Sequence, residues 1–437
     1  MNTIIGITGP SGVGKSTIAK IIMICLGHQD SIILSGDDAH KWERSDENWN
    51  FFTHLNPFAN NLDQEYHEIL NLKKGKPINR SRYDHSNGKF TEKSKVSPKK
   101  FIVYEGLHTM HDSLVELIDL SFYIEVDKPL KNEWKISRDI KKRGYSIDQI
   151  IKTIENRKKD ERKFIEPQRE KCDVVLKFKK TLEGKINLSF DYVDPNLTGL
   201  INKIKKLYSL LEEFVCTSNL ISSNVNLTQN KGGNLSFKFE DIIIITESGS
   251  SFGEVSYFQG FGFYDIRGNS IFQDQRRPSM EIDCHMQLGP CCLHTHPLHV
   301  LSILCSKECD AILHEIFEDV AVMEYFPPGS AISENLKVHR NVFLKNHGIF
   351  ISRDTIHECL RDSLKFDQKS REFLIKKVKS KNFLFPDSFV LEVENRFYHS
   401  YVKDLIRCTG LTPNPLGSAE IEILDNMEEE KYRRSLK

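Results

Sequence analysis

The stretch Gly9-Pro10-Ser11-Gly12-Val13-Gly14-Lys15-Ser16-Thr17 decides the fold of the first part of the chain. A run rich in β-branched residues, 3–8, precedes it, and an apolar stretch with helical spacing, 18–26, follows it. A strand, a glycine-rich loop and a helix in this order predict a loop whose backbone N–H groups surround a polyphosphate. The alternative is a glycine-rich turn that matches by chance, and the agreement of all three segments favours the phosphate loop.

General phosphate-loop chemistry gives roles to these residues. Lys15 is expected to reach the β and γ phosphates, and Ser16 is expected to hold Mg²⁺. The predicted ligands are therefore ATP and Mg²⁺. The predicted nucleotide-binding residues are Gly9, Ser11, Gly12, Gly14, Lys15, Ser16 and Thr17.

Composition limits the class of protein. The chain has 437 residues, which predicts two or three domains, and 39% of them are hydrophobic. Lysine and arginine together number 61, and so do aspartate and glutamate, which gives a net charge of zero. This balance argues against nucleic acid as the main partner. No apolar segment is long enough to span a bilayer, and a strand begins the chain where a secretory signal would stand. Ten cysteines without a Cys-x-x-Cys pair suit reduced thiols, so we expect a cytoplasmic protein.

Acidic residues follow two further apolar runs. Residues 31–34 lead to Asp37 and Asp38, and residues 101–104 lead to Glu105. Residues 120–126 and 174–178 also read as strands, with helical stretches between them, which predicts an α/β fold with a mostly parallel sheet. Carboxylates at the carboxyl ends of parallel strands lie where such sheets bind ligands. The alternative for both aspartates is a helix cap.

Six motifs, in order, carry a family resemblance. Residues 9–178 resemble the phosphoribulokinase and uridine kinase family, and look most like its phosphoribulokinase branch. The matching motifs are Asp37-Asp38-Ala39-His40 with Arg44; His54-Leu55-Asn56-Pro57; Tyr83-Asp84-His85; Tyr104-Glu105-Gly106-Leu107-His108; Arg138-Asp139 with Arg143; and Phe164-Ile165-Glu166-Pro167-Gln168.

This resemblance implies an ATP-dependent small-molecule kinase. It implies that Asp37 is the general base for the attacking hydroxyl and that Glu105 binds Mg²⁺. The alternative for His40 is a core or surface histidine without a role in binding. The residues implied to bind the acceptor or its phosphates are His40, Arg44, Tyr83, Arg138 and Arg143.

A turn and cap signal, Asp194-Pro195-Asn196, separates a strand-like stretch, 185–193, from a helical stretch, 197–215. We therefore predict a kinase domain over residues 1–194 and a second domain over residues 195–437.

Histidines dominate the chemistry of the second domain. His294 and His296 are two residues apart in a strand-like run, which points both imidazoles to one face, and His347 follows in a distant segment. Three imidazoles with an open position are typical of a catalytic zinc site. The alternative is a pair of surface or core histidines.

Five motifs follow in order: Gly233-Asn234-Leu235-Ser236, Ser248-Gly249, Ser279 with Glu281, His294 with His296, and Asn346-His347-Gly348. Together they resemble the class II aldolase and adducin family. The resemblance implies an α/β/α domain with Zn²⁺ on His294, His296 and His347, and with Glu281 as the acid/base. A short segment between Glu281 and His294 leaves Glu315 as the alternative acid/base. The residues implied to hold a substrate phosphate are Gly233, Asn234, Ser248, Gly249 and Ser279.

The two halves together predict a bifunctional enzyme. Its kinase would phosphorylate a hydroxyl of a sugar or sugar phosphate, and its zinc domain would run aldol cleavage or addition on a phosphorylated ketose. Two alternatives stay open: a kinase fused to a zinc-dependent sugar-phosphate epimerase, decarboxylase or dehydratase, and a nucleotide-binding scaffold with a degenerate aldolase domain. We expect small-molecule substrates, no nucleic-acid or membrane partner, and a homo-oligomer such as a tetramer-type ring.

Overall fold

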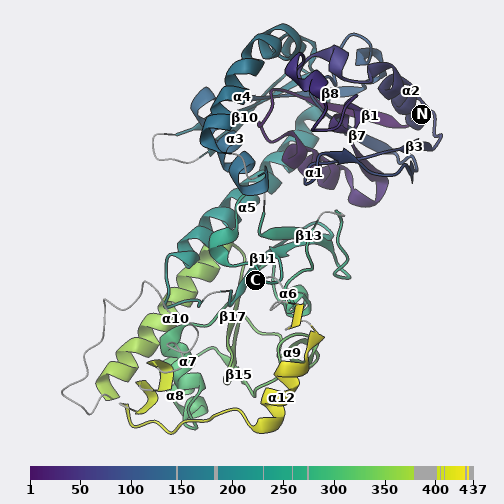
Figure 1. Cartoon of the computed structure of the whole chain (residues 1–437). Helices are drawn as coiled ribbons and strands as arrows, with labels where there is room; N and C mark the ends of the chain where they lie inside the picture. The colour runs from purple at the N-terminus through teal and green to yellow at the C-terminus, as the bar shows by residue number, and fades with distance from the viewer. Residues whose placement is uncertain are drawn as a thin grey trace. The chain divides into compact units, whose positions relative to one another are not determined.

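A computed structural model describes residues 1–143, 146–181, 186–229, 231–257, 259–272, 275–377, 401–403, 405–407, 409–428 and 431–432, without the side chains of residues 138, 141–143 and 425. The chain divides into two compact units, Met1–Tyr208 and Ser209–Lys437 (Figure 1). Helix α5 (Thr198–Ser222) contains the point of division, and the domain boundary near Asp194 stays a prediction.

The first unit is built on a six-stranded sheet in the order β10-β9-β8-β1-β7-β2. Every neighbouring pair is parallel except β9 and β10, so the predicted mostly parallel sheet is confirmed. The strands are β1 (Thr3–Thr8), β2 (Ser31–Ser35), β7 (Phe101–Glu105), β8 (Leu120–Val126), β9 (Val174–Lys180) and β10 (Ile186–Tyr192).

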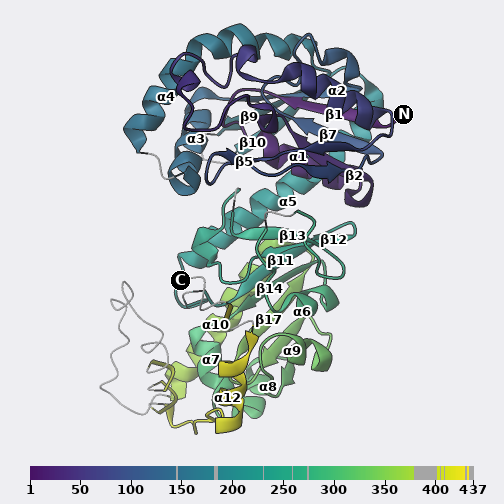
Figure 2. The ribbon, with the colours of Figure 1, turned by 45° about the vertical axis from the view of Figure 1, so that its right-hand side comes forward.

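Helices cover both faces of this sheet (Figures 1 and 2). Helix α1 (Lys15–Leu26) packs on β1, β2 and β7, and α2 (Leu62–Lys73) packs on the face that carries Ile4 and Tyr104. Apolar residues at helical spacing in α1 explain the packing of that helix, since Ile18, Ile21 and Ile22 are all buried. The other elements are α3 (Lys128–Arg143), α4 (Ile147–Asp160), and the short strands β3 (Ile78–Arg80), β4 (Tyr83–Asp84), β5 (Lys89–Phe90) and β6 (Ser94–Val96).

The second unit is built on a seven-stranded sheet in the order β13-β12-β11-β14-β17-β16-β15. All pairs are antiparallel except β15 and β16. The strands are β11 (Asn234–Phe239), β12 (Ile242–Thr246), β13 (Phe261–Asp265), β14 (Cys291–Thr295), β15 (Ala321–Met323), β16 (Asn341–Leu344) and β17 (Gly348–Arg353).

Two layers of helices enclose this sheet, as the α/β/α prediction required (Figure 2). Cys292 and Phe350 point to one face, where they pack with α6 (Ile282–Gln287) and α9 (Ser330–Asn335). Side chains alternate along a strand, so the neighbouring residues point to the other face, where α10 (Ile356–Lys377) packs on β14 and β17. The remaining helices are α7 (Leu298–Leu304), α8 (Cys309–Ile316) and α12 (Ser418–Asn426).

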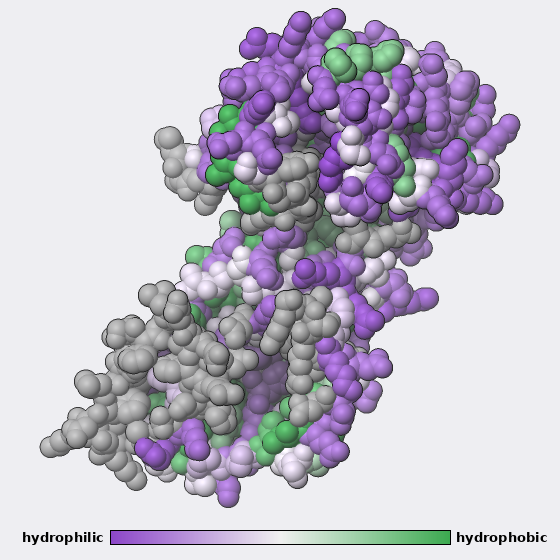
Figure 3. All heavy atoms as spheres, viewed as in Figure 1, coloured by the Kyte–Doolittle hydropathy of each residue, from purple (hydrophilic) through white to green (hydrophobic). Residues whose placement is uncertain are grey.

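The face of the first unit seen in Figure 3 is mostly hydrophilic. Among the residues that the structure describes, no helix has the length and apolar character needed to cross a membrane. The nine cysteines within the described ranges are all free thiols.

Candidate functional site

The phosphate loop joins β1 to α1. Gly12 and Gly14 both have φ of 86°, a left-handed conformation that favours glycine, and α1 begins directly at Lys15. The Lys15 ammonium group donates to the carbonyl oxygens of Gly9 and Pro10, each at 3.1 Å. Ser16 and Thr17 lie in the first turn of α1. The loop therefore sets a cation and the positive end of a helix side by side, which suits a polyphosphate.

The carboxyl ends of β2 and β7 bring two acidic residues to one edge of the sheet. Gly36 and Gly106 allow this approach, since a Cβ added at Gly36 would lie 3.2 Å from the Gly106 Cα. The hydroxyl of Ser16 donates to Glu105 Oε1 at 3.2 Å. Burial, together with the negative charge of Asp37, raises the pKa of Glu105 to about 7. A divalent cation between Ser16 and Glu105 would remove this cost, so these two side chains fit Mg²⁺.

Asp37 and Asp38 have different surroundings, although they are adjacent. The N-cap of the short helix that contains them is Ser35, whose hydroxyl accepts from the Asp37 N–H at 3.3 Å. Asp37 Oδ2 lies 3.3 Å from His85 Nε2. Burial acts to raise the pKa of Asp37, but the His85 hydrogen bond and the charges of His40, His85 and Lys15 lower it well below its usual value. Asp37 is therefore an ionised carboxylate.

Asp38 has a structural role. Its Oδ1 accepts from the Tyr83 N–H at 2.7 Å, and its Oδ2 lies 3.4 Å from Arg80 Nε. Arg80 is itself buried and also contacts Glu65 at 2.6 Å and Glu68 at 2.8 Å. Together these groups fix the segment that carries Tyr83 against the end of β2.

The predicted acceptor residues in the described part of the chain lie near Asp37. The buried ring of His40 contacts the edge of Tyr83, with centroids 5.2 Å apart, and Arg44 donates to the His85 carbonyl oxygen at 2.5 Å. His40 also lines a cavity of about 280 Å³ with Asp38 and Arg80. The side chains of Arg138 and Arg143 lie outside the described residues.

Sequence reasoning missed two residues of this site, His85 and Arg80. His85 stood in a matching motif but was given no role. One feature of the sequence pointed to a partner such as Arg80. Glu65 and Glu68 lie three residues apart in a helical stretch, so both carboxylates share a face that a cation can contact.

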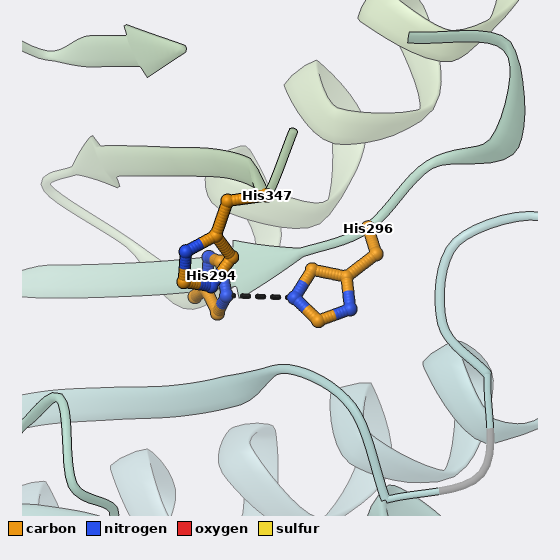
Figure 4. Close-up of side chains that lie close together, drawn as sticks. All are labelled: His294, His296 and His347. Atoms are coloured by element: carbon orange, nitrogen blue, oxygen red, sulfur yellow. Dashed lines mark hydrogen bonds between the residues drawn. The ribbon is translucent and has the colours of Figure 1, made fainter. Parts of the chain in front are cut away.

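In the second unit, His294, His296 and His347 come together (Figure 4). Their ligand atoms lie within 4.8 Å of one another, and the Nε2 atoms of His294 and His296 are 2.9 Å apart. His294 Nδ1 donates to the Ile349 carbonyl oxygen at 2.9 Å, which leaves the lone pair on Nε2. His347 Nδ1 is buried with no hydrogen-bond partner among the described residues. Imidazole nitrogens crowded in this way fit a divalent cation.

Glu281 lies against this cluster. Its Oε1 is 3.1 Å from His347 Nε2 and its Oε2 is 3.5 Å from His294 Nε2. Burial acts to raise the pKa of Glu281, but His294, His347 and the Asn234 amide lower it well below its usual value. Glu315 is exposed on α8 and does not belong to the cluster.

Several of the predicted phosphate-binding residues lie at the end of the sheet that carries the histidine cluster. Gly233 precedes β11, and a Cβ there would lie 2.6 Å from the His294 carbonyl oxygen. The N–H groups of Ser248 and Ser279 donate to the carbonyl oxygens of Arg277 and Thr246, so their hydroxyls are the donors left for an anion. Gly249, with φ of 74°, forms the turn after β12.

The cysteines that flank His294 belong to the core. Cys292 is fully buried and packs in the apolar core, and burial raises the pKa of Cys291 to about 12. Neither thiol belongs to the group of ligand atoms that His294, His296 and His347 form.

Replacing Gly348 by alanine is expected to disrupt the histidine cluster. The added Cβ would lie 2.5 Å from the Thr295 carbonyl oxygen and 2.6 Å from His296 Cδ2, so β17 must shift. Such overpacking costs about 1–3 kcal/mol. Urea unfolding and metal content measure the effect, with Gly253→Ala as the matched control, because the nearest atom there is 3.6 Å away. Equal behaviour of the two variants would contradict this prediction.

Comparisons with known proteins agree with both halves of the resemblance, which is confirmed. Residues 4–183 match the family model described as Phosphoribulokinase / Uridine kinase family, and residues 212–371 match the Class II Aldolase and Adducin N-terminal domain.

Two curated relatives illustrate the first match. The chain is 37% identical to the phosphoribulokinase of Synechocystis over 174 residues, which are 40% of this chain and 52% of that protein. It is 29% identical to the uridine kinase of Staphylococcus epidermidis over 212 residues, 46% of this chain and 98% of that protein. The chain therefore spans about half the length of the phosphoribulokinases that it matches.

For the second match, a solved class II aldolase domain from Thermoplasma acidophilum is 22% identical, with a TM-score of 0.35. The similarity covers 38% of this chain and 93% of that chain.

Proposed function

We propose that the chain is a bifunctional enzyme whose first domain, residues 1–194, transfers the γ-phosphoryl group of ATP to a hydroxyl of a sugar or sugar phosphate. One observation carries this half: Ser16 Oγ lies 3.2 Å from Glu105 Oε1 at the sheet edge that also carries Asp37. A phosphate loop, a metal-binding pair and a base are the parts that phosphoryl transfer needs.

The residues divide the work as follows. Lys15 and the N-terminus of α1 bind the β and γ phosphates, and Ser16 and Glu105 would hold Mg²⁺, which would supply further positive charge beside them. The acceptor oxygen forms a bond to the γ-phosphorus, while the bond from that phosphorus to the bridging oxygen breaks. The hydroxyl proton passes to Asp37, which His85 holds at 3.3 Å. His40, Arg44 and Tyr83 orient the acceptor. Arg138 and Arg143 neutralise negative charge on the acceptor or on the phosphates.

The test is ADP release with a panel of ketoses, aldoses and their phosphates, with mass spectrometry of the products. A product heavier by one phosphoryl group supports the proposal. ADP release that no member of the panel stimulates contradicts it.

Replacing Lys15 by methionine is expected to lower turnover of ATP by about 10²-fold, because an uncharged stem no longer offsets phosphate charge in the transition state. Lys20→Met on the same helix is the matched control. Turnover is measured as ADP release with the best acceptor from the panel. A K15M variant as active as K20M would exclude the assigned phosphate site.

For the second domain, residues 195–437, we propose aldol cleavage or addition on a phosphorylated ketose, with Zn²⁺ held by His294, His296 and His347. The observation that carries this half is the carboxylate of Glu281, 3.1 Å from one imidazole of a cluster that fits a divalent cation. Bound zinc would polarise the carbonyl of the substrate.

Glu281 moves the proton. In cleavage, one hydroxyl loses a proton as the carbon–carbon bond breaks, and the carbon of the three-carbon half gains one. A buried ionised carboxylate beside the imidazoles can hold a proton between these events. The backbone at Gly233 and Gly249 and the hydroxyls of Ser248 and Ser279 bind the phosphate of that half, with Asn234 next to them.

Metal analysis of the purified protein and a search for a three-carbon product from ketose phosphates test this half. Zinc together with such a product supports an aldolase. Zinc with an epimerised, decarboxylated or dehydrated product identifies another reaction of the domain, and absence of metal would favour a scaffold.

A further inference from the structure

Four buried side chains form an unbroken hydrogen-bonded chain that ends at the histidine cluster. Ser236 Oγ lies 2.7 Å from His285 Nδ1, His285 Nε2 contacts Asn234 Oδ1, and Asn234 Nδ2 donates to Glu281 Oε2 at 2.6 Å. None of the four is more than 5% exposed. We call these residues the 236–281 relay.

Two local periodicities produce the relay. Asn234 and Ser236 are two residues apart on β11 and therefore share a face of the sheet. Glu281 and His285 are four residues apart at the start of α6 and therefore share a face of the helix. Because α6 packs on this face of the sheet, Ser236 meets His285, and Asn234 meets both His285 and Glu281.

Only one arrangement of protons satisfies every contact of the relay. The Asn234 NH₂ group donates to Glu281 Oε2, so the Asn234 carbonyl oxygen faces His285. His285 Nε2 must then carry the proton that it donates to that oxygen. His285 Nδ1 consequently accepts from the Ser236 hydroxyl. If the Asn234 amide turned over, its oxygen would lie against the Glu281 carboxylate.

From this arrangement we infer that His285 is a positioning residue of the proposed metal site: it fixes the amide of Asn234, which holds one oxygen of Glu281 and leaves the other toward His347. The inference rests on the proposed function of the second domain. It gives His285 and Ser236 a role that neither would have as a core residue alone. It also gives the Asn234 side chain a task other than phosphate binding.

Three variants test the inference. His285→Leu keeps the bulk and removes both ring nitrogens. His285→Gln keeps an N–H that can reach Asn234 Oδ1 and a carbonyl oxygen that can accept from Ser236. Cys284→Ala is the matched control, since Cys284 is equally buried on the same helix but packs in the apolar core. The probes are Zn²⁺ affinity by chelator competition and the visible spectrum of the protein loaded with Co²⁺.

The expected result is a loss of Zn²⁺ affinity of about 10-fold in H285L, the lower end of what the loss of an outer hydrogen-bond partner costs at metal sites. The Co²⁺ spectrum of H285L is expected to shift, while H285Q and C284A resemble the unmodified protein. If H285L does not fold, Ser236→Ala takes its place, with a smaller change in the same direction.

Two outcomes would overturn the inference in distinguishable ways. If the unmodified protein binds Zn²⁺ but H285L matches C284A in affinity and spectrum, His285 is only a core residue and the proposed metal site stands. If the unmodified protein binds neither Zn²⁺ nor Co²⁺, the metal site and the positioning role fail together.

Discussion

Replacing Asp37 by asparagine is expected to lower ATP-dependent phosphorylation by about 10³-fold, within the range for loss of a general base. Asparagine keeps the shape of the side chain but cannot take the proton of the acceptor hydroxyl. His85 lies 3.3 Å from Asp37 Oδ2, and Lys15 and His40 add positive charge nearby. The carboxylate is therefore ionised and oriented before the acceptor arrives, and the amide removes its negative charge together with its ability to accept a proton.

The measurement compares turnover with ADP affinity, because the nucleotide contacts of the phosphate loop remain in D37N. Asp38→Asn is the matched control. Asp38 is 12% exposed and contacts Tyr83 and Arg80, whereas Asp37 is 36% exposed. D38N is expected to lose stability, whereas D37N is expected to lose turnover. If D37N kept its turnover, or if both variants lost ADP binding in parallel, Asp37 would not be the base.

Sequence reasoning located most of the sheet of the first unit because that sheet is parallel and buried. Such strands appear as continuous apolar runs, and residues 120–126 were predicted with the bounds that β8 has in the structure. Asp37 and Glu105 could be assigned to one edge for the same reason, since the order of strand, loop and helix fixes which ends of the strands meet.

Sequence reasoning could not predict the 236–281 relay or the contacts of Arg80 with Asp38, Glu65 and Glu68, and the reason is physical. The spacing of Asn234 with Ser236 and of Glu281 with His285 is visible in the sequence, but spacing alone does not say which helix covers which strand. A resemblance covered Glu281 and the three histidines. It gave His285 no role, because that role depends on the side-chain contacts of α6 with β11.

Replacing His294 by alanine is expected to empty the histidine cluster of zinc. His294 is the member most constrained by its neighbours: it stacks on Phe350, with centroids 4.2 Å apart, and Ile349 holds its Nδ1. Its Nε2 lies 2.9 Å from His296 and 3.5 Å from Glu281. Loss of a direct ligand should weaken Zn²⁺ binding by more than the roughly 10–100-fold that loss of an outer partner costs.

His299→Ala is the matched control for this variant, because His299 is also buried but pairs with Asp367 instead of the cluster. Both variants should lose some stability, and only H294A should lose its metal and its activity on ketose phosphates. ATP turnover should persist in H294A, since Lys15, Asp37 and Glu105 all belong to the other compact unit. Unchanged zinc content in H294A would refute the ligand assignment, whereas parallel loss of ATP turnover would show that the two sites do not work independently.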